Sequence, residues 1–338
     1  MRTRFALGVM LLVALSALPA CKRKLEPRAA QPDKVSLAFT QHVGLAPFFI
    51  AQEEGYYREA NLDVRFIPTP SSSKVLAGFL RGDIDVSAGN VSVGMLNAIG
   101  RGARVRIVAG KGSIGGPEDA YFALVARREL VESGRLKSPS DLKGLRIACT
   151  RAGPMEYCLS TLLKRGGLSD ADVTLRDLPN PIRAEALGSN ALDAVLSGEP
   201  WATREVKAGG VVWMTGGEII PGFEHGIIAY GERLLDRDAE VGRRFMAATF
   251  RGILRYNEGK TERNVALICR HTGLAREELM AASWPQIRND GAMSASAFDG
   301  FQNWALEKDL LDRRLTSDEY WDGRFVEHAN SQLREPGK

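Results

Sequence analysis

Strand-like and helix-like segments alternate between Val35 and Gly110, and this alternation constrains the fold more than any other feature of the sequence. An apolar run at Val35–Thr40 leads through a loop into a short helical segment, which begins near Pro47 and ends at Gly55. The strands predicted after the first one lie at residues 62–67, 84–89 and 105–109. Such a repeat predicts a mainly parallel sheet that helices cover on both faces.

The remaining length predicts a second unit of the same class. At 338 residues, the chain is longer than one hydrophobic core usually serves, so two lobes are expected. The second set of strands is predicted at residues 121–126, 145–149, 173–178 and 193–197, and a return crossing at 211–214 and 226–230. Between the last two strands, Pro221–His225 is placed to reach the cleft. From Asp236 onward the apolar spacing is helical, and this part is expected to pack on the first lobe.

Composition excludes one class of function. Hydrophobic residues make up 44% of the chain and charged residues 25%, as in an ordinary soluble α/β protein. The formal net charge is only +4, and no basic stripe is interleaved with aromatic residues. Nucleic-acid binding therefore has no support from the sequence.

Three stretches carry a resemblance to a known family. They are the segment from Ala46 to Val64, the stretch Leu80–Asn90 with its Gly-Asp-Ile-Asp-Val motif, and Asp141–Ala148. Together they resemble the solute-binding proteins of ABC importers for nitrate, taurine, alkanesulfonates and the thiamine-precursor pyrimidine, over about Val35 to Trp201. The resemblance implies a two-lobed periplasmic-binding-protein fold of type II, in which each lobe is a mainly parallel sheet flanked by helices and the ligand cleft lies between the lobes.

The amino-terminal residues read as a targeting segment. Arg2 and Arg4 precede an apolar run at Phe5–Leu18, which is too short to span a membrane comfortably. Leu18–Cys21 resembles a bacterial lipobox, in which the cysteine is acylated, although Pro19 departs from it and leaves plain secretion open. The expected organisation is a signal peptide at 1–21, a tether at 22–34, a first lobe at 35–113 and 216–338, and a second lobe at 114–215.

The predicted ligand-binding residues lie on strand-end loops of both lobes, because ligands of open α/β sheets bind beyond the carboxyl ends of the strands. They are Gln41, His42, Ser72, Ser73, Asn90, Val91, Ser92, Lys111, Thr150, Arg151, Gly153, Met155, Glu199 and Trp201. Loop 150–155 repeats the strand, loop and helix start of the first lobe, so it should face the cleft from the other side.

Each of these residues also has a plain structural interpretation. The serines at 71–73 and residues 90–92 either cap the following helices or hold a ligand at a helix amino terminus. Lys111 lies in the Gly-rich stretch Gly110–Pro117, interpreted as a mobile hinge, and is either a solvated loop lysine or a cation facing the ligand. Arg151 either pairs with a ligand anion or is a surface or interlobe ion-pair residue. Glu199 either contacts the ligand beside Trp201 or caps the next helix.

These residues leave the ligand class open. The helix amino termini with Lys111 and Arg151 suit a sulfonate, nitrate or another anion. Glu199 and Trp201 suit an aminopyrimidine-like compound, because a carboxylate repels anions and accepts N–H donors. The resemblance further implies that the bound form docks on an ABC permease in the inner membrane. A monomer without a cofactor, located in the periplasm or cell envelope and anchored through a lipidated Cys21, is expected.

Cysteines and histidines give no sign of metal binding or catalysis. The chain contains neither a CxxC nor an HExxH arrangement, and its four histidines are scattered. A disulfide between Cys149 and Cys158 is possible in an exported protein, and the sequence does not decide whether it forms. Enzymes that resemble this family include a pyrimidine synthase with a cysteine-rich motif and a cysteine-dependent desulfinase; the motif is missing here, and the first loop carries Gln41 and His42 where the desulfinase needs a cysteine. An exported enzyme, or a receptor presenting ligand to a membrane sensor, is the alternative function.

Overall fold

The computed structural model describes residues 31–39, 42–69 and 72–334, without the side chains of residues 72 and 73. The predicted signal peptide, Cys21, most of the predicted tether and Gln41 lie outside the described residues. Within the described part, no helix combines the length and the apolar character needed to cross a membrane.

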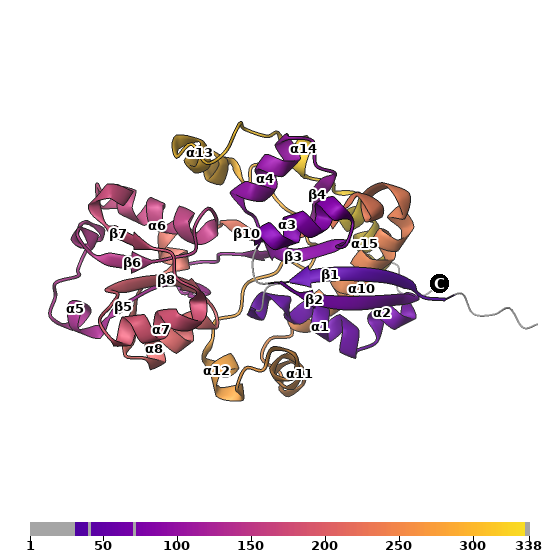
Figure 1. Cartoon of the computed structure of the whole chain (residues 1–338). Coiled ribbons are helices and arrows are strands. Elements are labelled where there is room, and N and C mark those ends of the chain that lie inside the picture. The colour runs from indigo at the N-terminus through magenta and orange to yellow at the C-terminus, as the bar shows by residue number, and fades with distance from the viewer. Residues whose placement is uncertain (1–30, 40–41, 70–71, 335–338) are drawn as a thin grey trace, which may run out of the picture. The chain divides into compact units, whose positions relative to one another are not determined.

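Two five-stranded sheets of the same topology form the framework (Figure 1). Sheet A has the order β2 (Leu62–Pro68), β1 (Asp33–Phe39), β3 (Val86–Asn90), β10 (Glu224–Gly231) and β4 (Val105–Ser113). Sheet B has the order β7 (Thr174–Arg176), β6 (Arg146–Ala148), β8 (Ala194–Gly198), β5 (Phe122–Arg127) and β9 (Gly210–Thr215). In each sheet the fourth strand alone runs antiparallel to its neighbours. The antiparallel strand is β10 in sheet A and β5 in sheet B. Each is the first strand after the chain crosses from the other sheet.

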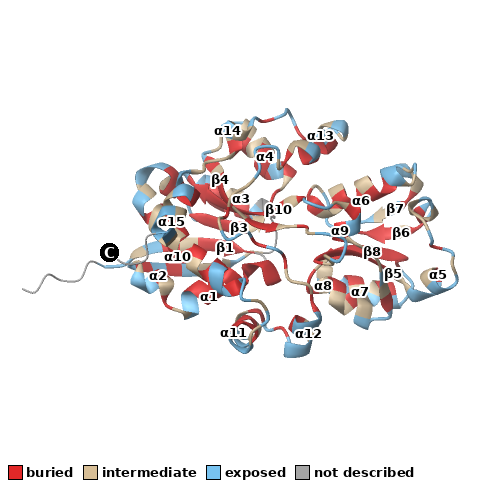
Figure 2. Ribbon diagram, turned by 180° about the vertical axis from the view of Figure 1, so that it is seen from behind, coloured by how far each residue is buried: buried red, intermediate tan, exposed pale blue. Residues whose placement is uncertain are grey.

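The strands are apolar because both faces of each sheet are covered. Successive side chains of a strand point to opposite faces. In β1, Val35 and Leu37 belong to one buried cluster while Ala38 belongs to another. In β5, Leu124 and Val125 are divided in the same way between two clusters. Figure 2 accordingly shows buried residues along the strands and exposed residues on the outward faces of the helices. The predicted α/β class with mainly parallel sheets is confirmed.

The helices follow the expected alternation. Those packed with sheet A are α1 (Ala46–Glu53), α2 (Tyr56–Glu59), α3 (Ser72–Arg81), α4 (Val93–Gly100), α10 (Ala239–Tyr256), α11 (Glu262–Thr272), α14 (Ser317–Tyr320) and α15 (Arg324–Arg334). Those packed with sheet B are α5 (Arg128–Glu132), α6 (Pro154–Arg165), α7 (Asn180–Gly188), α8 (Trp201–Lys207) and α9 (Gly216–Ile219). Single turns are η1 (Val43–Leu45), η2 (Pro139–Leu142), η3 (Asp170–Asp172) and the π-type η4 (Arg233–Arg237).

Two carboxy-terminal helices reach the helices of sheet B. In α12 (Arg276–Ala281), Glu278 forms an ion pair with Arg204 of α8 at 3.1 Å. In α13 (Asp299–Glu307), Glu307 pairs with Lys164 of α6. The carboxy-terminal region therefore contacts the helices of both sheets, on either side of the crossings (Figure 1).

The Gly-rich stretch after residue 109 is not the mobile loop that was expected. Residues 110–113 continue β4 and pair with β10, because β10 supplies a second strand edge that the sequence does not show locally. Beyond Ser113, the two crossings bond to each other. Ile114 donates its N–H to the Phe223 carbonyl at 2.9 Å, and Gly217 donates to the Asp119 carbonyl at 3.0 Å. The connection between the sheets is thus a paired, hydrogen-bonded structure.

Candidate functional site

The carboxyl ends of the parallel strands in the two sheets meet in one region. His42 follows β1, Asn90 ends β3, and Lys111 lies near the end of β4. Tyr121 precedes β5 and stacks on His225 of β10, with ring centroids 5.4 Å apart and planes at 18°. Since open α/β sheets bind ligands at this edge, the meeting point of the two edges is the candidate site.

Lys111 is the most unusual group in this region. It is only 2% exposed, and it forms no hydrogen bond or ion pair within the described part of the chain. Burial lowers the pKa of its amine to about 7, because the charged form has lost water and gained no counter-ion. The interpretation of Lys111 as a solvated loop lysine is therefore wrong.

Two buried imidazoles lie beside Lys111. His225 Nδ1 is 3.2 Å from the Asn90 side-chain oxygen, whereas its Nε2 and both ring nitrogens of His42 are buried without a partner among the described residues. Burial, and next the charge of Lys111, lower the pKa of His225 to about 3 and lower the pKa of His42 as well. Both rings are therefore neutral near pH 7, and their ring nitrogens can serve a polar ligand.

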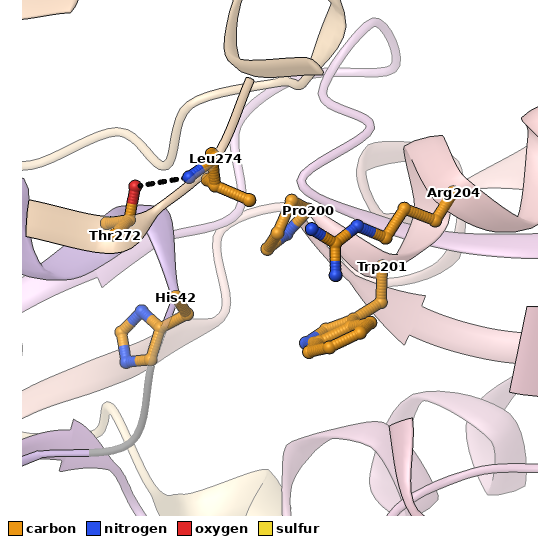
Figure 3. A pocket seen from close by; sticks show the side chains of 6 residues that line it. All are labelled: His42, Pro200, Trp201, Arg204, Thr272 and Leu274. Atoms are coloured by element: carbon orange, nitrogen blue, oxygen red, sulfur yellow. Dashed lines mark hydrogen bonds between the residues drawn. The ribbon is translucent and has the colours of Figure 1, made fainter. Parts of the chain in front are cut away.

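A small pocket opens next to His42 (Figure 3). Its volume is about 110 Å³, and its lining comes from the loop after β1, from the end of α11 and from the start of α8. The lining residues are His42, Thr272, Leu274, Pro200, Trp201 and Arg204. In Figure 3 the rings of His42 and Trp201 stand on opposite sides of the opening, and the Arg204 guanidinium lies over the Trp201 ring at 4.8 Å. The space is well below that of a drug-sized site and suits a small solute.

The residues expected at the start of α4 mainly have capping contacts. Ser92 Oγ accepts from the Met95 N–H at 3.3 Å, and the Val91 N–H donates to the His225 carbonyl at 2.9 Å. The N–H of Val93, the first helical residue, donates to the Ala152 carbonyl of the second lobe at 3.2 Å. This bond, from the residue just after the predicted ones, joins the two strand-end loops directly. For Ser72, the structure places the residue at the start of α3.

The 150–155 loop faces the first sheet, but the side chains of Thr150 and Arg151 bond to residues of their own lobe. Arg151 forms an ion pair with buried Glu156 at 3.0 Å, within the same loop and helix start. Thr150 Oγ1 accepts from Arg183 at 3.1 Å, and Arg183 is itself only 2% exposed. Gly153 is the N-cap of α6. The Cε of Met155 lies 3.1 Å from where a Cβ on Gly198 would stand, so the loop packs closely on the end of β8.

Glu199 caps the helix that follows it. It accepts from the Thr203 N–H at 3.1 Å, from the Thr203 hydroxyl at 2.9 Å and from the Ser283 N–H at 3.2 Å. Burial raises the pKa of its carboxyl group, which these three donors only partly offset. The last donor comes from the segment after α12, so Glu199 also connects sheet B with the carboxy-terminal region.

Several residues of the site are not among those predicted from the sequence. His225 lies in the segment predicted to reach the cleft, and Arg204 follows Trp201 by three residues on one helix, so both had a local signal. Tyr121, Thr272 and Leu274 had none, because only the tertiary fold brings their segments here.

The described part of the chain shows neither a disulfide nor a group of metal ligands. Cys149, Cys158 and Cys269 are free in the structure, and Cys149 and Cys158 are buried side chains without a bridge. Burial raises the pKa of the Cys149 thiol to about 12 and that of Cys158 further. Within the described ranges, no three His, Cys, Asp or Glu residues are grouped as metal ligands.

Solved structures share the whole fold. The aliphatic sulphonate binding protein SsuA from Escherichia coli is 15% identical with a TM-score of 0.69, covering 86% of this chain and 93% of its own. The nitrate-binding protein NrtA from Synechocystis PCC 6803 is 14% identical with a TM-score of 0.73 and 90% coverage of both chains. The desulfurization enzyme DSZB is 14% identical with a TM-score of 0.66, covering 89% and 100%. The expected periplasmic-binding-protein fold is confirmed.

Sequence comparison identifies a family but no individual relative among curated proteins. No curated protein sequence matches the chain. The model of the NMT1-like family matches residues 28–270, which include both sheets and every residue predicted to bind ligand. The chain therefore belongs to the NMT1-like family.

Proposed function

We propose that this protein is the exported solute-binding component of an ABC importer and that it captures a small anion of the sulfonate or nitrate class. The observation that carries the proposal is Lys111, a buried amine at the edge where the two sheets meet that has no acidic partner in the described part of the chain. A buried charge is stable only when it is paired, so an anion is the ligand that such a site accepts best. The likeness to SsuA and NrtA supports the same ligand class.

An aminopyrimidine is less well supported. Its N–H groups need a free acceptor, and Glu199, the acceptor expected from the sequence, already accepts three protein donors. Of the predicted site residues, His42, Lys111, Asn90 and Trp201 are the proposed contacts, and His225 joins them. Of the other predicted residues, those whose side chains the structure describes are proposed to shape the cleft.

A binding role is proposed over a catalytic one. The thiolate is the reactive form of cysteine, and burial holds the pKa values of the Cys149 and Cys158 thiols far above neutral pH. The exported location, the anchor at Cys21, the permease partner and a monomeric state, all expected from the sequence, are part of the proposal.

Ligand-dependent stabilisation tests the function. The mature protein is heated with nitrate, ethanesulfonate, taurine or an aminopyrimidine, and its unfolding temperature is compared with the free protein. A ligand at 100 times its Kd should stabilise the protein by about 2.7 kcal/mol. Stabilisation by the aminopyrimidine alone, or by none of the four, would overturn the anion proposal. Recovery of unchanged ligand after denaturation distinguishes capture from turnover.

Trp201 is expected to contribute directly to ligand binding. Replacing Trp201 by alanine removes one wall of the pocket and the ring beneath Arg204, and we expect about tenfold weaker binding of the stabilising anion. Isothermal titration measures the change. Trp213→Ala, on β9 and away from the pocket lining, serves as the control and should retain affinity. Equal losses in both variants would mean that Trp201 acts through folding alone.

A further inference from the structure

The amine of Lys111 lacks what a buried ammonium group normally requires. A lysine side chain that is almost fully buried is usually paired with a carboxylate or loses its proton. No carboxylate lies within ion-pair distance of Lys111 in the described ranges, and no carbonyl accepts from it there. The free site therefore holds this lysine balanced between its charged and neutral forms near neutral pH.

The acidic groups on the surrounding elements already have other donors. Asp119, on the crossing after β4, accepts from the N–H groups of Gly115 and Tyr121 at 2.7 and 2.9 Å. Glu224, at the start of β10, accepts from the Ser294 N–H at 2.9 Å. Glu199, from sheet B, is the helix cap described above.

The basic groups next to Lys111 do not supply a charge either. His42 and His225 respond to the charge of Lys111, and both imidazoles are neutral near pH 7. Asn90, the other polar neighbour, has no charge and binds His225. The pocket beside His42 is also lined by the Arg204 guanidinium, but that cation is already paired with Glu278. Lys111, whose charge lowers the pKa of both imidazoles, is the ionisable amine of this region that has no acidic partner among the described residues.

We propose that Lys111 takes up a proton from solvent when a small anion binds, so that the protein captures an anion together with one proton. This inference rests on the proposed anion-binding function. The anion supplies the missing counter-charge, which favours the ammonium form of Lys111. The neutral imidazoles donate or accept hydrogen bonds without adding a second charge.

The sign of the pH dependence follows from linkage. In the free protein the pKa of Lys111 is about 7, and a bound anion raises it. Below that pH the amine is already charged, so binding takes up almost no proton and affinity is constant. Above it the amine must be protonated on binding, so affinity should fall about tenfold for each pH unit. Proton uptake should approach one per anion at about pH 8.5.

Calorimetry measures the uptake directly. Nitrate and ethanesulfonate are titrated into the full mature protein at pH 6 and pH 8.5, each in two buffers of different ionisation enthalpy. Both anions are conjugate bases of strong acids, so any buffer dependence of the heat comes from the protein. We expect heats that are independent of the buffer at pH 6 and dependent on it at pH 8.5, with weaker affinity at the higher pH.

Three variants assign the proton. Lys111→Arg keeps a charge throughout this range and should bind with constant affinity and no uptake. Lys111→Met should bind the anion about 10- to 100-fold more weakly, again without uptake. Lys143→Met removes an exposed lysine and should behave like the parent protein.

The outcomes separate this inference from the proposed function. Binding with no buffer dependence and constant affinity between the two pH values overturns the proton coupling alone. Uptake that persists in Lys111→Met overturns the assignment to this lysine and points to His42 or His225. Failure of both anions to bind overturns the anion-binding function and the coupling together.

Discussion

Replacing Gly217 by alanine is expected to lower the free energy of unfolding by about 3 kcal/mol. The added methyl group would overlap with backbone atoms of the facing crossing, which cannot move away without shifting their neighbours. A Cβ at this position would stand 1.7 Å from the carbonyl oxygen of Gly116 and 2.5 Å from its carbon. Gly217 is the second residue of α9, directly after β9, and Gly116 lies on the opposite crossing. The substitution therefore pushes apart the two connections between the sheets, which bond to each other here. Urea-induced unfolding gives the change.

Gly116→Ala is the matched control. It lies on the facing segment, yet a Cβ there meets no atom within 4 Å, so its stability should remain within about 0.5 kcal/mol of the parent protein. If Gly217→Ala were as stable as Gly116→Ala, the two crossings would not be in the close contact that the structure describes.

The paired crossings also limit how the two sheets can move. Each crossing ends in the antiparallel strand of the next sheet, and β10 joins β3 to β4 in sheet A. A ligand can shift an open–closed equilibrium only through contacts that differ between the two states. In this protein the bond from Val93 to Ala152 and the ion pair of Arg204 with Glu278 connect elements of different sheets, so a change in the angle between the sheets would have to break them.

Local patterns predicted the regular elements well. Pro47 and Gly55 are the predicted ends of the first helical segment, and α1 runs from Ala46 to Glu53, within two residues of both. The 145–149 run was recognised as a buried strand, and β6 lies inside it. These features depend on the nearest neighbours in the chain, whose propensities and periodicity can be read from one sequence.

The site was harder to predict because its charges are decided by distant partners. Lys111 follows a glycine and precedes another, a typical loop composition, but pairing with β10 turns this segment into strand and buries the amine. The sequence leaves Arg151 between a ligand contact and a surface or interlobe ion pair, and the fold pairs it with Glu156 of its own lobe. Glu199 was left between two roles, and the donor from Ser283, far along the chain, favours the cap. Only tertiary structure contains such information.

The second large effect is expected from Glu205, a buried acid in sheet B's helix layer. Glu205 is 1% exposed, and burial raises the pKa of its carboxyl group to about 8, while the Ser197 hydroxyl at 2.7 Å and the charge of Arg183 act in the opposite direction. Because the folded-state pKa lies above the unfolded value, this group's contribution to stability is complete below about pH 4.5 and is lost as pH rises towards 8. Glu205→Gln resembles the protonated acid and should remove that loss, so at pH 8 the variant should be more stable than the parent protein by on the order of 3 kcal/mol.

Unfolding free energies measured by urea at pH 5 and pH 8 test this expectation. The difference between Glu205→Gln and the parent should be small at pH 5 and large at pH 8, since across this interval the group is mostly ionised in the unfolded chain while the folded protein keeps the proton until about pH 8. Glu185→Gln, an exposed position on neighbouring α7, should give no such difference. A variant that is less stable than the parent at both pH values would show that Glu205 is ionised in the folded protein and held by Arg183. In that case Glu205 would already pair with the buried charge of Arg183, whose guanidinium donates to Thr150 at the cleft. Lys111 would then remain as the group whose charge an incoming anion neutralises.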